Sequence, residues 1–160
     1  MHPALSFRVW FSRFVATAAV LAVLPASSAA AAPPEEFDVS IDYPAGVVCA
    51  FPLSLDASGK TKVIDRGDST IVTGPRNVFT LTNDATGAST TQRLGGIFKD
   101  RSLGGGLTAT VSTGRNLVFT SNAGAVLLVG RYEFTLDADG ALVGRYEGKG
   151  QLVDLCARLS

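Results

Sequence analysis

The chain has 160 residues, which is enough for one domain with its own hydrophobic core. Its 14 basic and 14 acidic residues balance, so the composition gives no support for a polyanionic partner such as nucleic acid. Its one histidine, one tryptophan and one methionine all lie within the first ten residues.

The first 31 residues have the pattern of a secretory signal peptide. Two arginines precede an apolar run from residue 14 to 24, and a proline and then small residues follow it. We predict cleavage after Ala30 or Ala31, a single domain over residues 32–160, and a secreted, extracellular protein. The apolar run is too short to cross about 30 Å of hydrocarbon, so we expect no stable membrane anchor.

Cleavage would change the chemical inventory of the chain. The histidine, the tryptophan and the methionine would leave with the signal peptide, and 12 basic residues would remain against 14 acidic ones after the loss of Arg8 and Arg13. Without histidine, the mature protein has no Ser-His-Asp triad and no zinc site built on imidazole. We therefore expect no catalytic residue, no metal and no cofactor.

The two cysteines, Cys49 and Cys156, lie near opposite ends of the predicted domain. An even number of cysteines in an exported protein indicates a structural disulfide. The sequence therefore predicts one bond between Cys49 and Cys156, which closes most of the domain into a loop.

From residue 33 onward, glycine and Asp/Asn turn signals recur about every ten residues. The short runs between them are rich in Val, Ile, Leu, Thr and Phe, which favour strands, and no segment keeps a helical period. One short helical turn around residues 44–48 is compatible with the sequence. The pattern predicts an all-β antiparallel meander, which we expect to form a small closed β-barrel, with a β-sandwich as the alternative.

The segment from residue 126 to 152 predicts a β-hairpin. A three-residue loop over residues 138–140, with Gly140 in the left-handed conformation, keeps the apolar even-numbered positions of both strands on one face. This register sets Tyr132 opposite Tyr146 and Phe134 opposite a glycine. Glycines on that face favour strong curvature. The outer-face pairs of this register are Glu133 with Arg145 and Arg131 with Glu147.

The aromatic residues on the inner face of this hairpin, Tyr132, Phe134 and Tyr146, are candidate pocket-lining residues. In a barrel they could line a ligand cavity, with the tyrosine hydroxyls at its edge. As filling of a core they would have the same sequence pattern, so both interpretations remain.

Two segments resemble each other, Arg76–Asn83 and Arg115–Asn122, and each follows a Thr-Gly pair closely. Two copies are too few for a repeat protein, so we interpret them as two strands that begin in the same way. A separate feature is Asp154, which lies among apolar residues. A carboxylate in such surroundings needs a partner, and Arg158 or a turn amide could supply it.

Four short stretches are spread over the predicted domain, namely residues 49–53, 113–119, 137–140 and 150–156. They resemble small exported proteins of unknown function from high-GC Gram-positive bacteria (actinobacteria). The resemblance implies export and the type of source, and it implies no activity.

Three functions are compatible with these observations. The first is an exported non-catalytic binding domain that holds a small apolar ligand in a barrel. The second is a secreted structural or interaction protein, including an enzyme inhibitor, whose surface binds an extracellular protein. The third is a small barrel enzyme of isomerase or cyclase type. The lack of catalytic motifs favours a non-catalytic protein and leaves enzymatic activity open.

Overall fold

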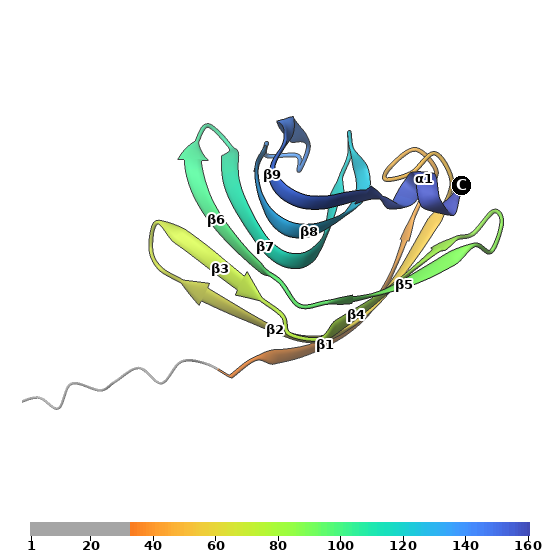
Figure 1. Ribbon diagram of the computed structural model, residues 1–160, viewed down its shortest axis with the longest axis horizontal. Coiled ribbons are helices and arrows are strands. Elements are labelled where there is room, and N and C mark those ends of the chain that lie inside the picture. Colours follow the sequence, from red (N-terminus) through yellow and green to blue (C-terminus); the bar gives the residue numbers. More distant parts are fainter. Residues whose placement is uncertain (1–32) are drawn as a thin grey trace, which may run out of the picture. The chain divides into compact units, whose positions relative to one another are not determined.

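The computed structural model describes residues 33–160, and the predicted signal peptide of residues 1–31 lies outside the described residues. These residues form an all-β domain with one short helix (Figure 1). The elements are β1 (Glu35–Tyr43), β2 (Leu53–Asp65), β3 (Ser69–Thr73), β4 (Asn77–Asn83), β5 (Ser89–Leu94), β6 (Ile97–Gly104), β7 (Leu107–Thr120), β8 (Gly124–Leu136), β9 (Leu142–Asp154) and α1 (Leu155–Leu159).

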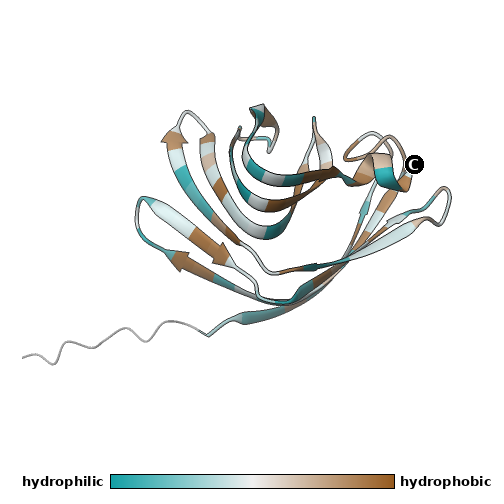
Figure 2. Ribbon diagram, viewed as in Figure 1, coloured by the Kyte–Doolittle hydropathy of each residue, from teal (hydrophilic) through white to brown (hydrophobic). Residues whose placement is uncertain are grey.

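All of these strands belong to one antiparallel sheet with the order β5-β4-β2-β3-β6-β7-β8-β9, and β1 pairs with β2. β4 pairs with the first part of β2 and β3 with its last part, and β5 and β6 then pair with β4 and β3. Most consecutive strands are neighbours, except that β4 returns to β2 and β6 returns to β3, and the predicted all-β antiparallel meander is confirmed. Apolar and polar residues alternate along the strands, as Figure 2 shows.

The sheet stays open, so the predicted closed barrel is not confirmed. Among the strands of residues 33–160, β9 pairs only with β8 and β1 pairs only with β2. β7, β8 and β9 arch over β1, β4 and β5 instead of continuing round to β1 (Figure 1). Two layers therefore face each other near α1, and they merge into one sheet toward the β2–β3 and β6–β7 turns.

A row of glycines crosses the sheet and marks where the two layers separate. Gly114 pairs with Gly130, and Gly130 pairs with Gly150. A Cβ atom on Gly114 would lie 2.9 Å from the Cα atom of Gly96, and one on Gly150 would lie 3.0 Å from that of Gly130. Neighbouring backbones are thus too close here for side chains. We call the row the glycine crease; it consists of Gly59, Gly74, Gly96, Gly114, Gly130 and Gly150.

Two asparagines fill the space that the crease glycines leave. The side chain of Asn77 lies where a Cβ atom on Gly59 or Gly74 would be, and that of Asn116 lies where one on Gly96 would be. These are equivalent positions in the two similar segments of the sequence, each one residue after an arginine. The similarity thus reflects two crease positions, one at the start of β4 and one inside β7.

The larger hydrophobic core lies between the two layers. The rings of Tyr43 and Phe119, one from each layer, stack with their centroids 5.7 Å apart. The buried residues of this core are Cys49, Leu53, Leu55, Ala57, Leu81, Leu94, Leu117, Ala125, Leu127, Leu155 and Leu159. Alternate positions of β2 supply three of them, which is the period of two expected for a half-buried strand.

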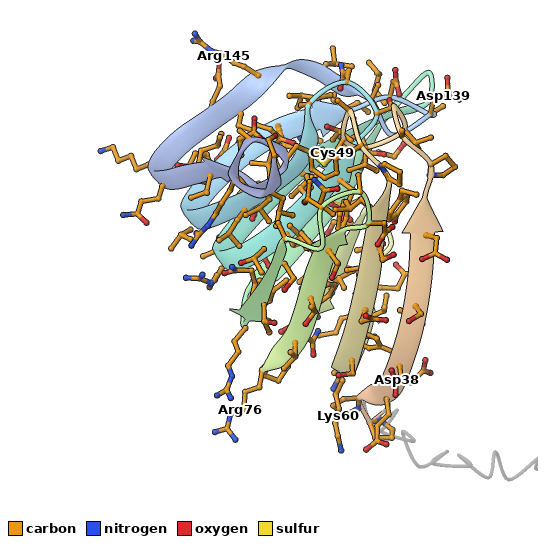
Figure 3. The ribbon with its side chains drawn as sticks, turned by 90° about the vertical axis from the view of Figure 1, so that its right-hand side faces the viewer. Asp38, Cys49, Lys60, Arg76, Asp139 and Arg145 are labelled. Atoms are coloured by element: carbon orange, nitrogen blue, oxygen red, sulfur yellow. A yellow bond between two sulfur atoms is a disulfide. The ribbon has the colours of Figure 1, made fainter. Side chains whose placement is uncertain are left out.

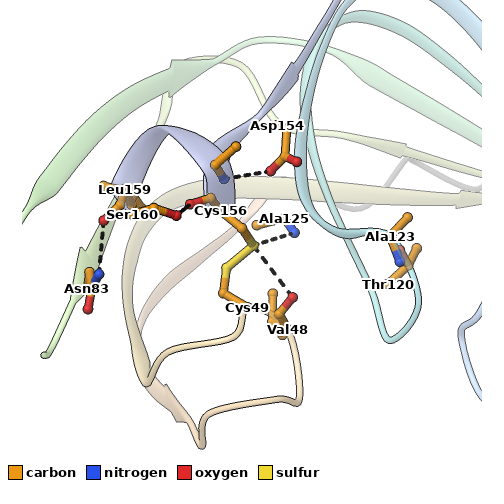
Figure 4. The surroundings of a disulfide bond; sticks show 11 residues. Val48, Cys49, Asn83, Thr120, Ala123, Ala125, Asp154, Cys156, Leu159 and Ser160 are labelled. Atoms are coloured by element: carbon orange, nitrogen blue, oxygen red, sulfur yellow. Dashed lines mark hydrogen bonds between the residues drawn. A yellow bond between two sulfur atoms is a disulfide. The ribbon is translucent and has the colours of Figure 1, made fainter.

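The predicted disulfide between Cys49 and Cys156 is present, with Cα atoms 5.4 Å apart (Figure 4). It joins the loop after β1 to α1, across a sequence separation of 107 residues. In the chain-entropy model, closing a loop of this length stabilises the fold by about 4–5 kcal/mol. The bond therefore holds the two layers together at the end of the domain away from the crease.

Hydrogen bonds secure the short helix α1, which the sequence did not predict. The Asp154 carboxylate accepts the Ala157 N–H at 2.9 Å and caps the first turn. Of the two partners that the sequence allowed, a turn amide is the one observed, and Asp154 is exposed, so the expectation of an apolar environment around it is wrong. The Asn83 amide donates to the Leu159 carbonyl at 2.9 Å, which ties α1 to the end of β4 (Figure 4).

The β8–β9 hairpin has the predicted turn and part of the predicted register. Gly140 is left-handed, with φ 75°, and Thr135 pairs with Val143 as the three-residue loop requires. A bulge after Glu133 then shifts the register by two residues, so Tyr132 pairs with Gly148 and not with Tyr146. The shift is even, and the inner face therefore stays the same.

The bulge has a local cause and a consequence for the charged residues. Gly144 adopts φ 83°, which lets β9 loop outward so that the Tyr146 ring packs edge-on against Phe134. The predicted cross-strand Arg–Glu pairs are therefore wrong. The ion pairs of the hairpin form within each strand, between Arg131 and Glu133 at 2.9 Å and between Arg145 and Glu147 at 3.2 Å.

The close contacts at the crease predict that replacing one of its glycines by alanine lowers the free energy of unfolding strongly. Gly130→Ala places a Cβ atom onto the Lys149 carbonyl oxygen at φ 133°, so we expect the free energy of unfolding to fall by about 3 kcal/mol or more. Gly87→Ala is the control, because Gly87 also has a positive φ, 76°, but has open space around it. Backbone strain alone should lower its free energy of unfolding by about 1–2 kcal/mol. Urea unfolding of both variants measures the difference, and equal losses would show that backbone contact at the crease is unimportant.

Candidate functional site

A cleft of about 230 Å³ opens at the glycine crease, between the layer of β1, β4 and β5 and the strands β3, β6 and β7. It lies at the edge of the larger core, where the layers separate. Its apolar walls are Phe37, Val72, Phe79, Leu94, Phe98 and Leu117. Gly74 and Gly96 contribute bare backbone to the lining, so the crease itself makes room for the cleft.

Three phenylalanines from three strands give the cleft its aromatic character. Phe37 and Phe79 have ring centroids 6.3 Å apart with their planes tilted by 55°. Phe98 lines the cleft from β6, and all three rings are half-buried. Aromatic surface left partly exposed in a concave site favours the binding of an apolar molecule that covers it.

The polar groups of the cleft come mainly from the two crease asparagines. Asn77 is 8% exposed and Asn116 is 4% exposed. The Asn77 Oδ1 accepts the Lys60 backbone N–H at 3.0 Å. The Asn116 Nδ2 donates to the Ser112 hydroxyl at 2.8 Å and to the Thr113 carbonyl at 3.1 Å. These bonds fix the orientation of both amides, so the cleft has a preorganised polar floor.

The residues of 33–160 that line this cleft include no ionisable side chain and no cysteine. A general acid, a general base or a charged nucleophile is therefore not provided by the lining. No group of three or more His, Cys, Asp or Glu in the described residues could hold a metal ion. What the cleft offers chemically is apolar contact and neutral hydrogen bonding.

The structure brings the sequence-predicted residues Tyr132, Phe134 and Tyr146 together in a second, smaller core. This core lies on the opposite face of β8 from the first and also contains Val118, Val126 and Leu128. Phe134 and Tyr146 pack edge-to-face with centroids 5.0 Å apart. Burial raises the pKa of Tyr146, an effect that the neighbouring Thr120 partly offsets. None of the three lines the cleft at the crease.

A larger depression of about 890 Å³ lies over β6, β7, β8 and β9, and Phe134 contributes to its floor. It is open to solvent, and charged side chains line it: Lys99, Arg101, Glu133, Arg145 and Glu147. Figure 3 shows Arg145 extending away from the strands. Both of its carboxylates already pair with arginines. Both spaces are partly open to solvent, and the cleft at the crease is the stronger candidate because apolar and aromatic side chains make up most of its lining.

Sequence reasoning missed the cleft because its phenylalanines come from strands far apart in the chain. The signal that could have found it is the resemblance between the Arg76 and Arg115 segments, which places an asparagine beside a glycine twice. If the glycines of neighbouring strands had been paired with each other, both asparagines would have been placed beside the same row of glycines.

The chain was also compared with known proteins, and no family model, no curated protein and no solved structure matches it. In residues 33–160 no helix has the length and apolar character needed to cross a membrane. The function is therefore argued from the geometry of the cleft.

Proposed function

We propose that this protein is an exported, non-catalytic binding domain that holds a small apolar ligand in the cleft at the glycine crease. The observation that carries the proposal is the group of three half-buried phenylalanines around a concave space of about 230 Å³. Covering such surface gains about 25 cal/mol for each Å² of apolar area removed from water. The fold supports preorganised binding, since the crease and the asparagine hydrogen bonds fix the walls before a ligand arrives.

The volume limits the ligand to a molecule of one or two rings. An apolar cavity of roughly 150 Å³ is known to hold benzene in another protein. A cleft of about 230 Å³ therefore has room for a body somewhat larger than benzene, such as toluene or indole. Longer ligands would have to extend past the half-buried phenylalanines into solvent.

The non-catalytic part of the proposal follows from the lining. Enzymes of isomerase or cyclase type that transfer a proton need a general acid or a general base. The described residues of the cleft supply neutral amides, one threonine hydroxyl and apolar side chains. Those groups orient and enclose a ligand, which is the chemistry of a binding domain.

The export part rests on the signal-peptide pattern and on the disulfide. Disulfides persist in oxidising compartments, and the Cys49–Cys156 bond is compatible with an extracellular protein. We expect the denatured mass of protein secreted from an actinobacterial host to lack the first 30 or 31 residues and to carry two hydrogens fewer than the reduced chain. An intact N-terminus or two free thiols in the secreted product would contradict export with an oxidised pair.

A substitution that fills the cleft tests the binding site. Val72→Phe adds a ring at the cleft wall, so we expect it to weaken the binding of toluene and indole by about tenfold or more. The wild-type dissociation constants should fall below about 1 mM. Titrations followed by ¹H–¹⁵N NMR report both the affinity and the integrity of the fold.

The matched control is Val63→Phe, because Val63 is the cross-strand partner of Val72, is 59% exposed and does not line the cleft. This variant should bind both probes as the wild type does. If neither probe shifts the signals of cleft residues in the wild type, or if both variants bind equally well, the proposed binding site is wrong.

A further inference from the structure

The floor of the cleft carries one hydrogen-bond donor and one acceptor that are left free within the described residues. Asn77 uses its Oδ1 to accept the Lys60 N–H, and its Nδ2 makes no hydrogen bond. Asn116 uses its Nδ2 for two bonds, and its Oδ1 accepts none. Asn77 thus has a free N–H donor, and Asn116 has a free oxygen acceptor.

These free atoms remain accessible although both side chains are more than nine-tenths buried. Among the described residues, the Tyr146 hydroxyl is the one fully enclosed polar side-chain atom without a partner. The free atoms of Asn77 and Asn116 are therefore not sealed inside the protein. Both side chains line the cleft.

The two amides lie on neighbouring parts of the crease. Asn77 Nδ2 packs over Gly74, and the amide of Asn116 packs over Gly96. Gly74 directly follows Thr73, and Gly96 directly precedes Ile97, which is the cross-strand partner of Thr73. The donor of one asparagine and the acceptor of the other therefore belong to neighbouring positions of the crease.

We propose that the ligand of this cleft is a neutral, flat ring compound with an N–H group beside a C=O group, as in a lactam or a cyclic imide. The inference rests on the proposed binding function of the cleft. The ligand carbonyl accepts from Asn77 Nδ2, its N–H donates to Asn116 Oδ1, and its ring lies among Phe37, Phe79 and Phe98. Both asparagines are already held by their other hydrogen bonds, so little conformational entropy is lost on binding.

Charged ligands fit the same site poorly. A carboxylate or an ammonium group buried between aromatic walls would lose its hydration and find no opposite charge among the described residues of the lining. A purely apolar ring would displace water from the two free amide atoms without replacing its hydrogen bonds. A neutral compound with one donor and one acceptor avoids both costs.

Two isomeric probes test this inference without altering the protein. 6-Methyl-2-pyridone carries the N–H and C=O pair, while N-methyl-2-pyridone has the same atoms and lacks the N–H donor. We expect the first to bind about tenfold more tightly in ¹H–¹⁵N NMR titrations, since neutral hydrogen bonds of this kind discriminate by about that factor. The side-chain amide signals of Asn77 and Asn116 should both shift with the tighter probe.

A protein variant tests the donor separately. Asn77→Asp keeps an oxygen that can accept the Lys60 N–H and removes the free Nδ2 donor. With the carboxyl ionised, so that it offers no donor, we expect the affinity for 6-methyl-2-pyridone to fall about tenfold relative to the affinity for toluene. The ligand comparison still decides the question if this variant folds poorly.

The outcomes separate this inference from the proposed function. If toluene binds in the cleft and the two pyridones bind equally, the binding domain stands and the lactam-like ligand class is overturned. If neither toluene nor a pyridone shifts the signals of the cleft, the proposed function and this inference both fail.

Discussion

Along the glycine crease, the place of each Cβ atom is taken either by a neighbouring backbone or by the side chain of Asn77 or Asn116. This contact separates the sheet into two layers on one side and keeps it single on the other. The sheet is also open, and β7, β8 and β9 arch over the first strands rather than continuing toward β1 (Figure 1). Where side chains are missing, Asn77 and Asn116 fill the gap and turn their amides toward a cleft. Fold and candidate site thus have one physical origin.

The opposite end of the domain is held by different forces. The Cys49–Cys156 bond, the two buried leucines of α1 and the Asn83–Leu159 hydrogen bond fasten the layers together there. That end is fixed and its core is filled with leucines, whereas the apolar cleft lies at the crease. A rigid wall around half-buried aromatic rings suits the binding of a small neutral molecule, and it needs no movement of the layers.

The sequence predicted what depends on local pattern. Strand content, antiparallel order, the disulfide and the turn ending at Gly140 all follow from composition, spacing and turn chemistry. It could not predict the bulge at Gly144, because the bulge depends on the packing of Tyr146 against Phe134, a pair that the predicted register does not place opposite each other. It also could not place Phe37, Phe79 and Phe98 around one space. That grouping depends on where the layers separate, and only the alignment of glycines from six chain segments determines this.

The central claim is that the cleft at the crease is a binding site for a small ring. The most direct measurement is a crystal structure of the protein soaked with iodobenzene, because iodine reveals its position by anomalous scattering. The account predicts an anomalous peak between Phe37, Phe79 and Phe98, with the ring above the two asparagines. A well-ordered crystal with a solvent-accessible cleft and no iodine in it would contradict the account, as would iodine bound only elsewhere on the molecule.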